Sequence, residues 1–264
     1  MLKRTKSIIA LSVISATPTL FAQEAGRIQA GQFDLIPSFT SSMAYVDNVA
    51  YARDDDPEIY SWRATISPEL IAATQIDGNP FQVGYRLERG VFFSSSADDY
   101  TDHFIEASGE YELNSRHRVN AIAQYEDGHE ERGTGFSLGL GTAITTPDRY
   151  KSTSLGGEYS YGAVTSDGVI TLKANRETLD YERSEQAYLI RDRVKNKVGA
   201  ELGYRIGSAT TALLDVTQTF VRYDNQTGIT TRDSDETRVL LGVRWESTAA
   251  TTGFAKVGYK EKDF

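Results

Sequence analysis

The chain has 264 residues, of which 39% are hydrophobic, and its formal net charge is −9. The mean hydropathy is negative, which by itself suggests a soluble protein. Such an acidic chain is a poor candidate for nucleic-acid binding. It contains no cysteine, which excludes disulfides and thiolate metal sites.

The N-terminus has the features of a secretory signal peptide covering residues 1–22. Three basic residues precede an apolar run from Ile8 to Leu20, which is too short to cross a bilayer as a helix. Cleavage is expected after Ala22. Residues 23–32 would then form a periplasmic N-terminal segment, and residues 33–264 the folded domain. No cysteine follows the apolar run, so a lipoprotein anchor is excluded.

From Phe33 onward, apolar and polar residues alternate in segments that are separated by turn residues, a pattern typical of β-strands. The sequence predicts eleven strands of about 10 to 14 residues, long enough to cross a membrane at a tilt. In chain order, their apolar faces run over residues 33–45, 60–70, 81–93, 105–113, 119–125, 155–161, 170–174, 194–206, 214–220, 239–245 and 255–259.

The connections between these strands alternate strictly between short and long. The short ones cover residues 75–80, 114–117, 162–168, 207–210 and 247–252, and the long, polar ones cover 47–58, 94–102, 126–151, 178–191 and 224–235. All long loops therefore lie at one end, as in outer-membrane barrels with short periplasmic turns. The pattern favours an all-β, antiparallel, up-and-down transmembrane β-barrel with a periplasmic N-terminus. A water-soluble antiparallel sandwich is the alternative.

Charged residues indicate which face of each strand meets water. Arg193, Lys195, Lys197, Glu201 and Arg205 occupy alternate positions of the eighth strand. A Lys or Arg that faces lipid at the middle of the membrane costs about 2 to 4 kcal/mol, so this row must face the lumen. The same argument assigns these residues to the lumen: Arg63, Arg86, Glu88, Glu106, Glu110, Arg118, Lys173, Arg238, Arg244, Lys256 and Lys260.

Most strand aromatics fall on the opposite, lipid-facing side, as membrane-interface girdles require. They are Trp62, Tyr85, Tyr111, Tyr125, Tyr159, Tyr161, Tyr204, Trp245 and Tyr259. Phe92 and Phe104 are expected to point inward. A row of inward aromatics would suggest stacking on sugar rings, but two residues do not make a row. A local bulge or packing against a loop explains them better.

No catalytic or metal-binding arrangement emerges, and we expect no enzyme activity and no cofactor. His117 lies in a predicted periplasmic turn and His129 in a predicted outer loop, so they cannot readily share a metal. Ser108 has no neighbouring histidine that would make it a lipase nucleophile. The acidic residues 54–56 and 98–99 lack the spacing of a calcium loop and are interpreted as solvated loop charge.

Several stretches resemble one known family. They are FDLIPSFTSSMAYVDNV at 33–49, SSADDYTDH at 95–103, RGTG at 132–135, PDRYKSTSLGGEYSYG at 147–162 and VRYDN at 221–225. They resemble the outer-membrane β-barrel porins found with exopolysaccharide or capsule biosynthesis operons. The resemblance implies export of a polysaccharide across the outer membrane, with periplasmic or inner-membrane synthesis and export proteins as partners. It supplies no catalytic residues.

Members of that family usually continue with further strands, whereas this chain stops after the eleventh. Bacterial single-chain barrels have even strand numbers. Lys260 and Lys262 occupy alternate positions before the terminal Phe264, where an insertion signal would have apolar residues. We therefore expect a truncated chain and an incompletely closed sheet, with the first and eleventh strands unpaired and prone to aggregation.

The functional hypothesis is an outer-membrane conduit for an exopolysaccharide or capsular polysaccharide, surrounded by membrane lipid and lipopolysaccharide. A general diffusion porin is the main alternative, and a structural or adhesive barrel is the third. Ordinary solvation of the lumen, with basic side chains paired to Glu106 and Glu110, remains an equal alternative to polymer binding. The candidate polymer contacts are Arg193, Lys195, Lys197, Arg205, Arg238, Arg244, Lys256, Glu106 and Glu110.

Overall fold

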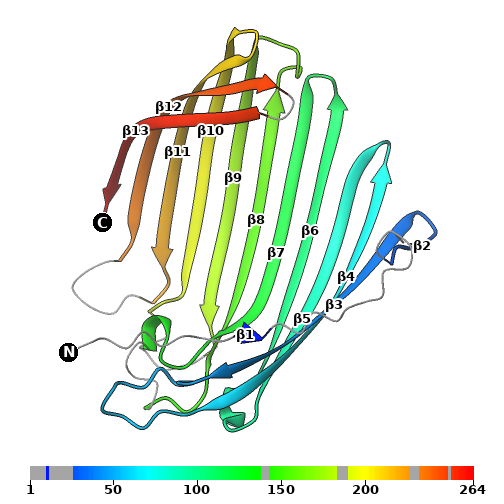
Figure 1. The fold of residues 1–264 in the computed structure, drawn as a ribbon. Helices are drawn as coiled ribbons and strands as arrows, with labels where there is room; N and C mark the ends of the chain where they lie inside the picture. Colours follow the sequence, from blue (N-terminus) through cyan, green and yellow to red (C-terminus); the bar gives the residue numbers. More distant parts are fainter. Residues whose placement is uncertain (1–9, 12–25, 138–142, 183–189, 226–231, 249–250) are drawn as a thin grey trace.

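The computed structural model describes residues 10–11, 26–137, 143–182, 190–225, 232–248 and 251–264. Long antiparallel strands, joined in chain order, form one curved sheet (Figure 1). The long strands are β3 (Phe33–Val46), β4 (Ser61–Ile76), β5 (Asn79–Phe92), β6 (Tyr100–Asn114), β7 (His117–Glu130), β8 (Asp148–Tyr161), β9 (Gly168–Tyr181), β10 (Arg193–Gly207), β11 (Thr210–Tyr223), β12 (Ser234–Thr248) and β13 (Thr251–Asp263). The short elements are β1 (Ala10–Leu11), β2 (Ile28–Ala30) and the 3-10 turns η1 (Ser96–Asp98) and η2 (Gly135–Ser137).

The eleven predicted strands are confirmed as β3–β13, each hydrogen-bonded to its neighbour in sequence. Several run further toward the long loops than expected. β7 continues to Glu130 and β8 starts at Asp148, within the stretch predicted as one long loop. These extensions were missed because both faces of the strands are polar there. Among the described residues, no helix is long and apolar enough to span a membrane.

The predicted alternation of short and long connections is confirmed. Residues 77–78 and 115–116 make tight turns at one end of the sheet, whereas residues 47–60 and 93–99 make longer loops at the other. We term these the periplasmic end and the outer end, because outer-membrane barrels place short turns in the periplasm.

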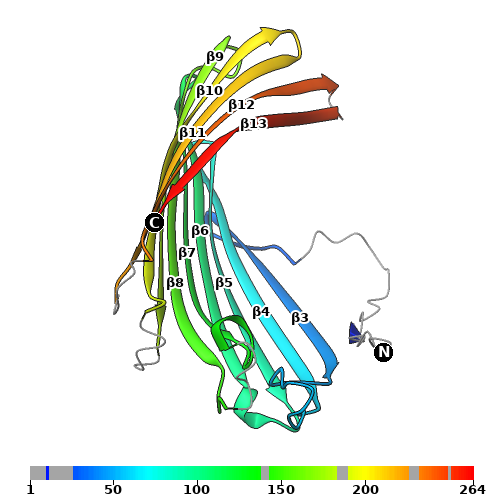
Figure 2. The same cartoon turned by 90° about the vertical axis from the view of Figure 1, so that its left-hand side faces the viewer.

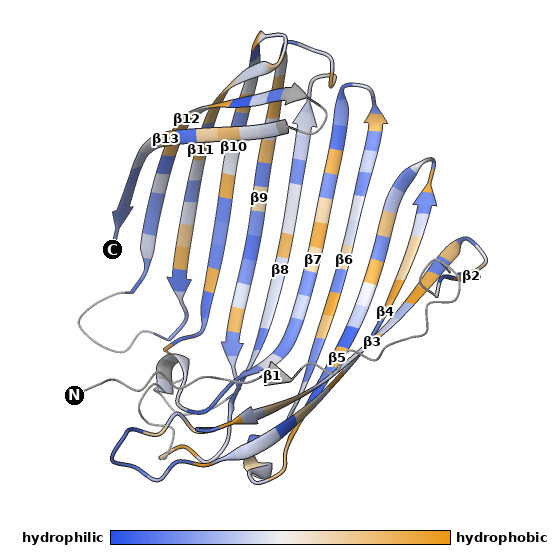
Figure 3. Ribbon diagram, viewed as in Figure 1, coloured by the Kyte–Doolittle hydropathy of each residue, from blue (hydrophilic) through white to orange (hydrophobic). Residues whose placement is uncertain are grey.

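The two faces of the sheet differ in chemistry, as Figure 3 shows by the alternating hydropathy along each strand. Apolar side chains of the convex face lie open, for example Val83 at 53% and Leu241 at 62% exposure. The concave face carries the polar and charged residues that were assigned to the lumen. A soluble monomer does not leave an apolar surface of this extent in water. The convex face therefore fits contact with lipid.

The sheet is not closed (Figure 2). Within the described residues, β13 pairs with β12 alone, which agrees with the expected free edge. The expectation that the first long strand is unpaired is wrong in part. β2 pairs with the periplasmic end of β3, where Ile28 lies opposite Leu35, and β1 pairs with its outer half, where Ala10 lies opposite Ala44.

β12 and β13 bend over toward the concave side of the sheet (Figure 2). Gly258 lies on the concave face of β13, opposite Leu240. A Cβ atom at Gly258 would approach the Val239 carbonyl oxygen to 1.9 Å, so the close approach requires glycine. The bend brings β13 side chains near β10 and β11.

Candidate functional site

The concave face holds a cavity of about 1000 Å³, lined by residues from β2 to β12. Its wall is rich in amide and hydroxyl groups, which can donate and accept hydrogen bonds. These polar residues include Gln29, Gln32, Gln82, Ser108, Asn120, Asn175 and Thr217. Charged residues of both signs complete the lining, among them Glu110, Glu158, Lys173, Lys197, Asp215 and Arg238.

Beside this cavity, Lys256 on β13 bridges two carboxylates of the neighbouring strands β10 and β11. Its Nζ lies 2.6 Å from Glu201 Oε2 on β10 and 3.0 Å from Asp215 Oδ2 on β11. Strands β10 and β13 are three spacings apart, or about 14 Å across a flat sheet. The Lys256–Glu201 contact is therefore possible because the sheet curls.

Three more cations surround the same two carboxylates. Arg244 Nη2 lies 3.2 Å from Glu201 Oε1, and Lys173 Nζ lies 3.9 Å from Glu201 Oε2. Arg238 Nη2 lies 3.9 Å from Asp215 Oδ1. We term Lys173, Glu201, Asp215, Arg238, Arg244 and Lys256 the ionic cluster. Cations outnumber carboxylates in it, so it presents an excess of positive charge to the lumen.

The other candidate residues are spread along the lumen. Lys195 Nζ lies 3.3 Å from Glu177 Oε2, and Arg205 Nη2 donates to the Val164 carbonyl at 3.2 Å near the periplasmic end. Glu106 accepts a hydrogen bond from Gln124 Nε2 at 2.8 Å.

Three candidate residues make neither a side-chain ion pair nor a side-chain hydrogen bond with the residues that the structure describes: Arg193, Lys197 and Glu110. Lys197 and Glu110 line the large cavity, and Arg193 lines a smaller one near the outer end. These side chains are available to solutes in the lumen.

Among the described residues, no ion pair joins Glu106 or Glu110 to a candidate basic residue. The carboxylates that pair with Arg238, Arg244 and Lys256 are Glu201 and Asp215, which lie directly opposite each other on β10 and β11. Glu106 and Glu110 lie on β6, four strands away from β10. Asp215 was missed because it is a single acidic residue in an otherwise apolar and hydroxyl-bearing strand.

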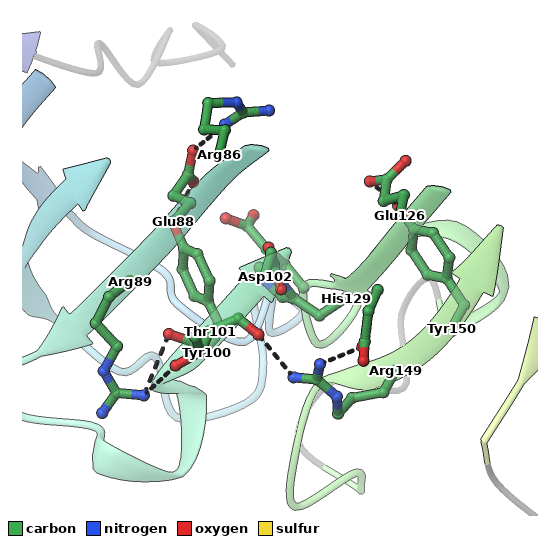
Figure 4. Close-up of polar contacts among 12 residues, drawn as sticks. Arg86, Glu88, Arg89, Tyr100, Thr101, Asp102, Glu126, His129, Arg149 and Tyr150 are labelled. Atoms are coloured by element: carbon green, nitrogen blue, oxygen red, sulfur yellow. Dashed lines mark hydrogen bonds and ion pairs between the residues drawn. The ribbon is translucent and has the colours of Figure 1, made fainter. Parts of the chain in front are cut away.

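Aromatic residues also line the outer half of the lumen, and three of them fall within the predicted long loops. Tyr100, Tyr150 and Tyr181 lie in strands and face inward. Tyr100 Oη donates to Glu88 Oε1 at 3.0 Å, and Tyr150 Oη donates to Glu126 Oε1 at 2.7 Å (Figure 4). The period-two run Tyr100, Asp102, Phe104 was a usable signal for this extension.

Arginine side chains cover the faces of two inward rings, Phe104 and Tyr181. The Arg86 guanidinium lies 3.7 Å from the ring centroid of Phe104, which confirms the expected inward direction of Phe104. Arg191 covers Tyr181 at 3.8 Å. Such contacts fix the position of each guanidinium. These two rings therefore position charge rather than present open faces to sugars.

The comparisons with known proteins agree with this architecture. Residues 23–264 match the family described as "Putative beta-barrel porin 2". The chain belongs to this family of β-barrel porins. Membership and the up-and-down sheet point to the outer membrane. No curated protein matches the chain.

Two solved structures resemble the porin chain weakly. One is OmpTΔL8, a loop L8 deletion mutant of the Vibrio cholerae outer membrane protein OmpT, with 12% identity and a TM-score of 0.44 over 89% of this chain and 95% of that chain. The other is OmpT folded in vitro, with 12% identity and a TM-score of 0.41 over 90% of each chain. Likeness at this level adds nothing to what the strand pairing shows.

At the outer end of the porin, loops fold over the lumen and form its best-buried region. Val49 of the first long loop packs on inward-facing Phe92 and Tyr100. This confirms loop packing as the reason for the inward Phe92. Glu131 accepts from Arg63 Nη1 at 2.8 Å and from Tyr51 Oη at 3.0 Å. Burial, and next the Glu131 carboxylate, raise the pKa of Tyr51.

Two further expectations at this end need correction. Asp98 is not solvated loop charge, because it is buried and forms an ion pair with buried Arg132. His129 lies in β7 rather than in a loop, and its Nδ1 lies 2.8 Å from Asp102 Oδ2. His117 is at the opposite end of the same strand. Within the described parts of the chain, no group of three side chains could hold a metal ion.

Proposed function

We propose that this porin is an outer-membrane conduit for the export of an exopolysaccharide or capsular polysaccharide. The observation that carries the proposal is the cavity of about 1000 Å³ on the concave face, with its amide, hydroxyl and charged lining. A polysaccharide is rich in hydroxyl groups, which such a wall can contact weakly and repeatedly. Weak, repeated contacts allow a polymer both to enter and to leave.

The candidate contact residues divide into three groups. Lys197 and Arg193, which have no ion-pair partner among the described residues, are the ones we assign to the polymer. Arg238, Arg244 and Lys256 are engaged with carboxylates and support the wall, while their excess charge still attracts anionic groups. Lys195, Arg205, Glu106 and Glu110 complete the proposed lining.

The surroundings follow from the same proposal. Membrane lipid and lipopolysaccharide would contact the convex apolar face. Periplasmic synthesis or export proteins would deliver the polymer to the periplasmic end. Export of the porin itself would use the signal peptide in residues 1–22, cleaved after Ala22.

Deletion of the gene in a polymer-secreting host tests the proposal. Secreted polymer should fall and polymer should accumulate in the periplasm. Complementation with Lys197→Glu and Arg193→Glu should restore export less well than the unchanged chain, while Lys151→Glu, on the convex face, should restore it fully. Unchanged export in the deletion strain, or full export with the lumen variants correctly assembled, would rule the role out.

A general diffusion porin is the second candidate, favoured by the family description. Conductance of the protein in planar bilayers, with and without the polymer of its host, separates the two. A conduit should show current that the polymer blocks, whereas a general porin should show current that the polymer leaves unchanged. A structural barrel should show neither conductance nor an export defect on deletion.

A further inference from the structure

Charges on the concave face are separated by sign along the sheet. The strand register assigns each side chain to a face, because residues directly opposite each other share one. On β3–β9 the inward positions are mainly acidic: Asp34, Glu69, Glu88, Asp102, Glu106, Glu110, Glu112, Glu126, Glu130, Asp148, Glu158 and Glu177, against Arg63, Arg86, Arg118 and Lys173. We term this surface the acidic wall.

On the remaining strands the sign reverses. The inward positions of β10–β13 are mainly basic: Arg193, Lys195, Lys197, Arg205, Arg238, Arg244, Lys256, Lys260 and Lys262, against Glu201, Asp215, Glu236 and Glu246. We term this surface the basic wall. Three of its four carboxylates are already engaged, since Lys256 bridges Glu201 and Asp215 and Lys260 Nζ lies 3.0 Å from Glu236. The net positive charge of this wall therefore remains toward the lumen.

The two walls meet around one cavity. Glu110 on β6 and Glu158 on β8 line it from the acidic side, and Lys197 on β10 and Arg238 on β12 line it from the basic side. Glu110 and Lys197 are the two lining residues of opposite charge that make no ion pair with the described residues. A charged cleft with low-dielectric walls focuses the field across it.

We propose that this cavity preferentially binds saccharides that carry both a carboxylate and an ammonium group, such as an alternating uronate and amino-sugar chain. The inference rests on the proposed conduit function and specifies its substrate class. The carboxylate would contact Lys197 and the ammonium group would contact Glu110. The basic wall attracts a polyanion, but the acidic wall repels it. A polycation is attracted by the acidic wall and repelled by the basic wall. A zwitterionic chain can place an opposite charge against each wall.

Three oligosaccharides of matched length test the proposal by titration calorimetry with the full chain refolded in detergent micelles. De-N-acetylated hyaluronan alternates glucuronate with glucosamine and is zwitterionic. Hyaluronan itself is anionic, and chito-oligosaccharide is cationic. One exposed ion pair contributes about 0.2 to 1 kcal/mol. The zwitterionic chain should therefore bind up to about fivefold more tightly than either of the other two.

Two single substitutions on opposite walls assign the preference to the cavity. Lys197→Gln should weaken binding of the zwitterionic and anionic chains, whereas Glu110→Gln should weaken the zwitterionic and cationic chains and strengthen hyaluronan. Lys151→Gln, on the convex face, should change none of the affinities. Equal affinity for all three probes, or tightest binding of hyaluronan or chito-oligosaccharide, would overturn the proposal. The export assay tests the conduit function separately. If the porin exported polymer but bound all three probes equally, the conduit function would stand and the preference for zwitterionic chains would be wrong.

Discussion

Replacing Lys256 by methionine should destabilise the C-terminal part of the sheet more than any other single lysine substitution on β13. Lys256 links β13 to β10 and β11 through contacts of 2.6 Å to Glu201 and 3.0 Å to Asp215. Its side chain is 17% exposed, and the two carboxylates are similarly buried, so solvent screens these contacts little. Removing the ammonium group leaves two carboxylates close together with weaker partners.

The expected magnitude follows from the contacts that remain. Hydrogen bonds to charged groups contribute about 1.5 to 3 kcal/mol each. Removing one partner of a buried pair costs about 3 to 5 kcal/mol when the other charge is left uncompensated. Here Arg244 still lies 3.2 Å from Glu201, and Arg238 lies 3.9 Å from Asp215. We therefore expect a loss of about 2 to 4 kcal/mol in the free energy of unfolding.

Urea unfolding in lipid vesicles, followed by tryptophan fluorescence, can measure this loss locally. The chain has two tryptophans, so a Trp62→Phe background leaves Trp245 as the single reporter. Trp245 lies on β12 opposite Gly253 of β13, and its ring covers that glycine. Its emission should therefore report separation of β12 from β13.

Lys260→Met is the matched control. Lys260 is on the same strand and face, but its side chain is 58% exposed and its pair with Glu236 should contribute less than about 1 kcal/mol. Adding Glu201→Gln to the Lys256→Met variant should recover part of the lost stability. Equal midpoints for the two lysine variants would refute the view that the ionic cluster stabilises the bend.

Three further predictions concern the bend and the outer loops. Gly258→Ala should lower stability by about 1 to 3 kcal/mol in urea titrations because its Cβ would meet backbone, whereas Gly207→Ala, with nearest neighbours at 3.8 Å, should have little effect; equal losses would contradict this. Arg132→Ala should leave Asp98 buried without its ion pair and expose the outer loops to limited proteolysis, and unchanged cleavage would contradict the loop packing. Burial raises the pKa of Asp192, so the folded state binds that proton more tightly and stability should fall as pH rises through the folded-state pKa. The Asp192→Asn variant should not show this fall. If its melting temperature changed between acidic and neutral pH as much as that of the unchanged chain, the prediction would be wrong.

The strand order and the faces could be predicted because a spanning strand has a fixed period of two, and one charged row sets the orientation of all the others. Lys197 and Arg238 were assigned to the lumen on that basis, and both line the cavity. The short turns could also be predicted, because turn residues interrupt the alternation of apolar and polar side chains. Nothing more than alternation and loop length was needed for this part of the fold.

The partners of each charge were not predictable, because they depend on register and curvature. Lys256 on β13 contacts Glu201 on β10, with β11 and β12 between them in the sheet, and no local sequence pattern predicts this contact. The packing of the outer loops was also not predictable, because polar and charged loop residues are usually exposed to solvent. Asp98 and Arg132 are each charged in sequence and yet buried together in the structure. Their burial depends on three loops that meet over the lumen.

The most direct test of the central claim, that the convex face meets lipid and the concave face meets water, is a cysteine scan of β10. The chain has no cysteine, so each variant carries a single label site. Spin labels placed successively at positions 195–202 in lipid vesicles should alternate. Labels at Val198, Ala200 and Leu202 should be accessible to oxygen dissolved in the bilayer, and labels at Lys195, Lys197 and Glu201 to a water-soluble nickel chelate. Loss of the alternation, or the reverse assignment of the two faces, would contradict the account.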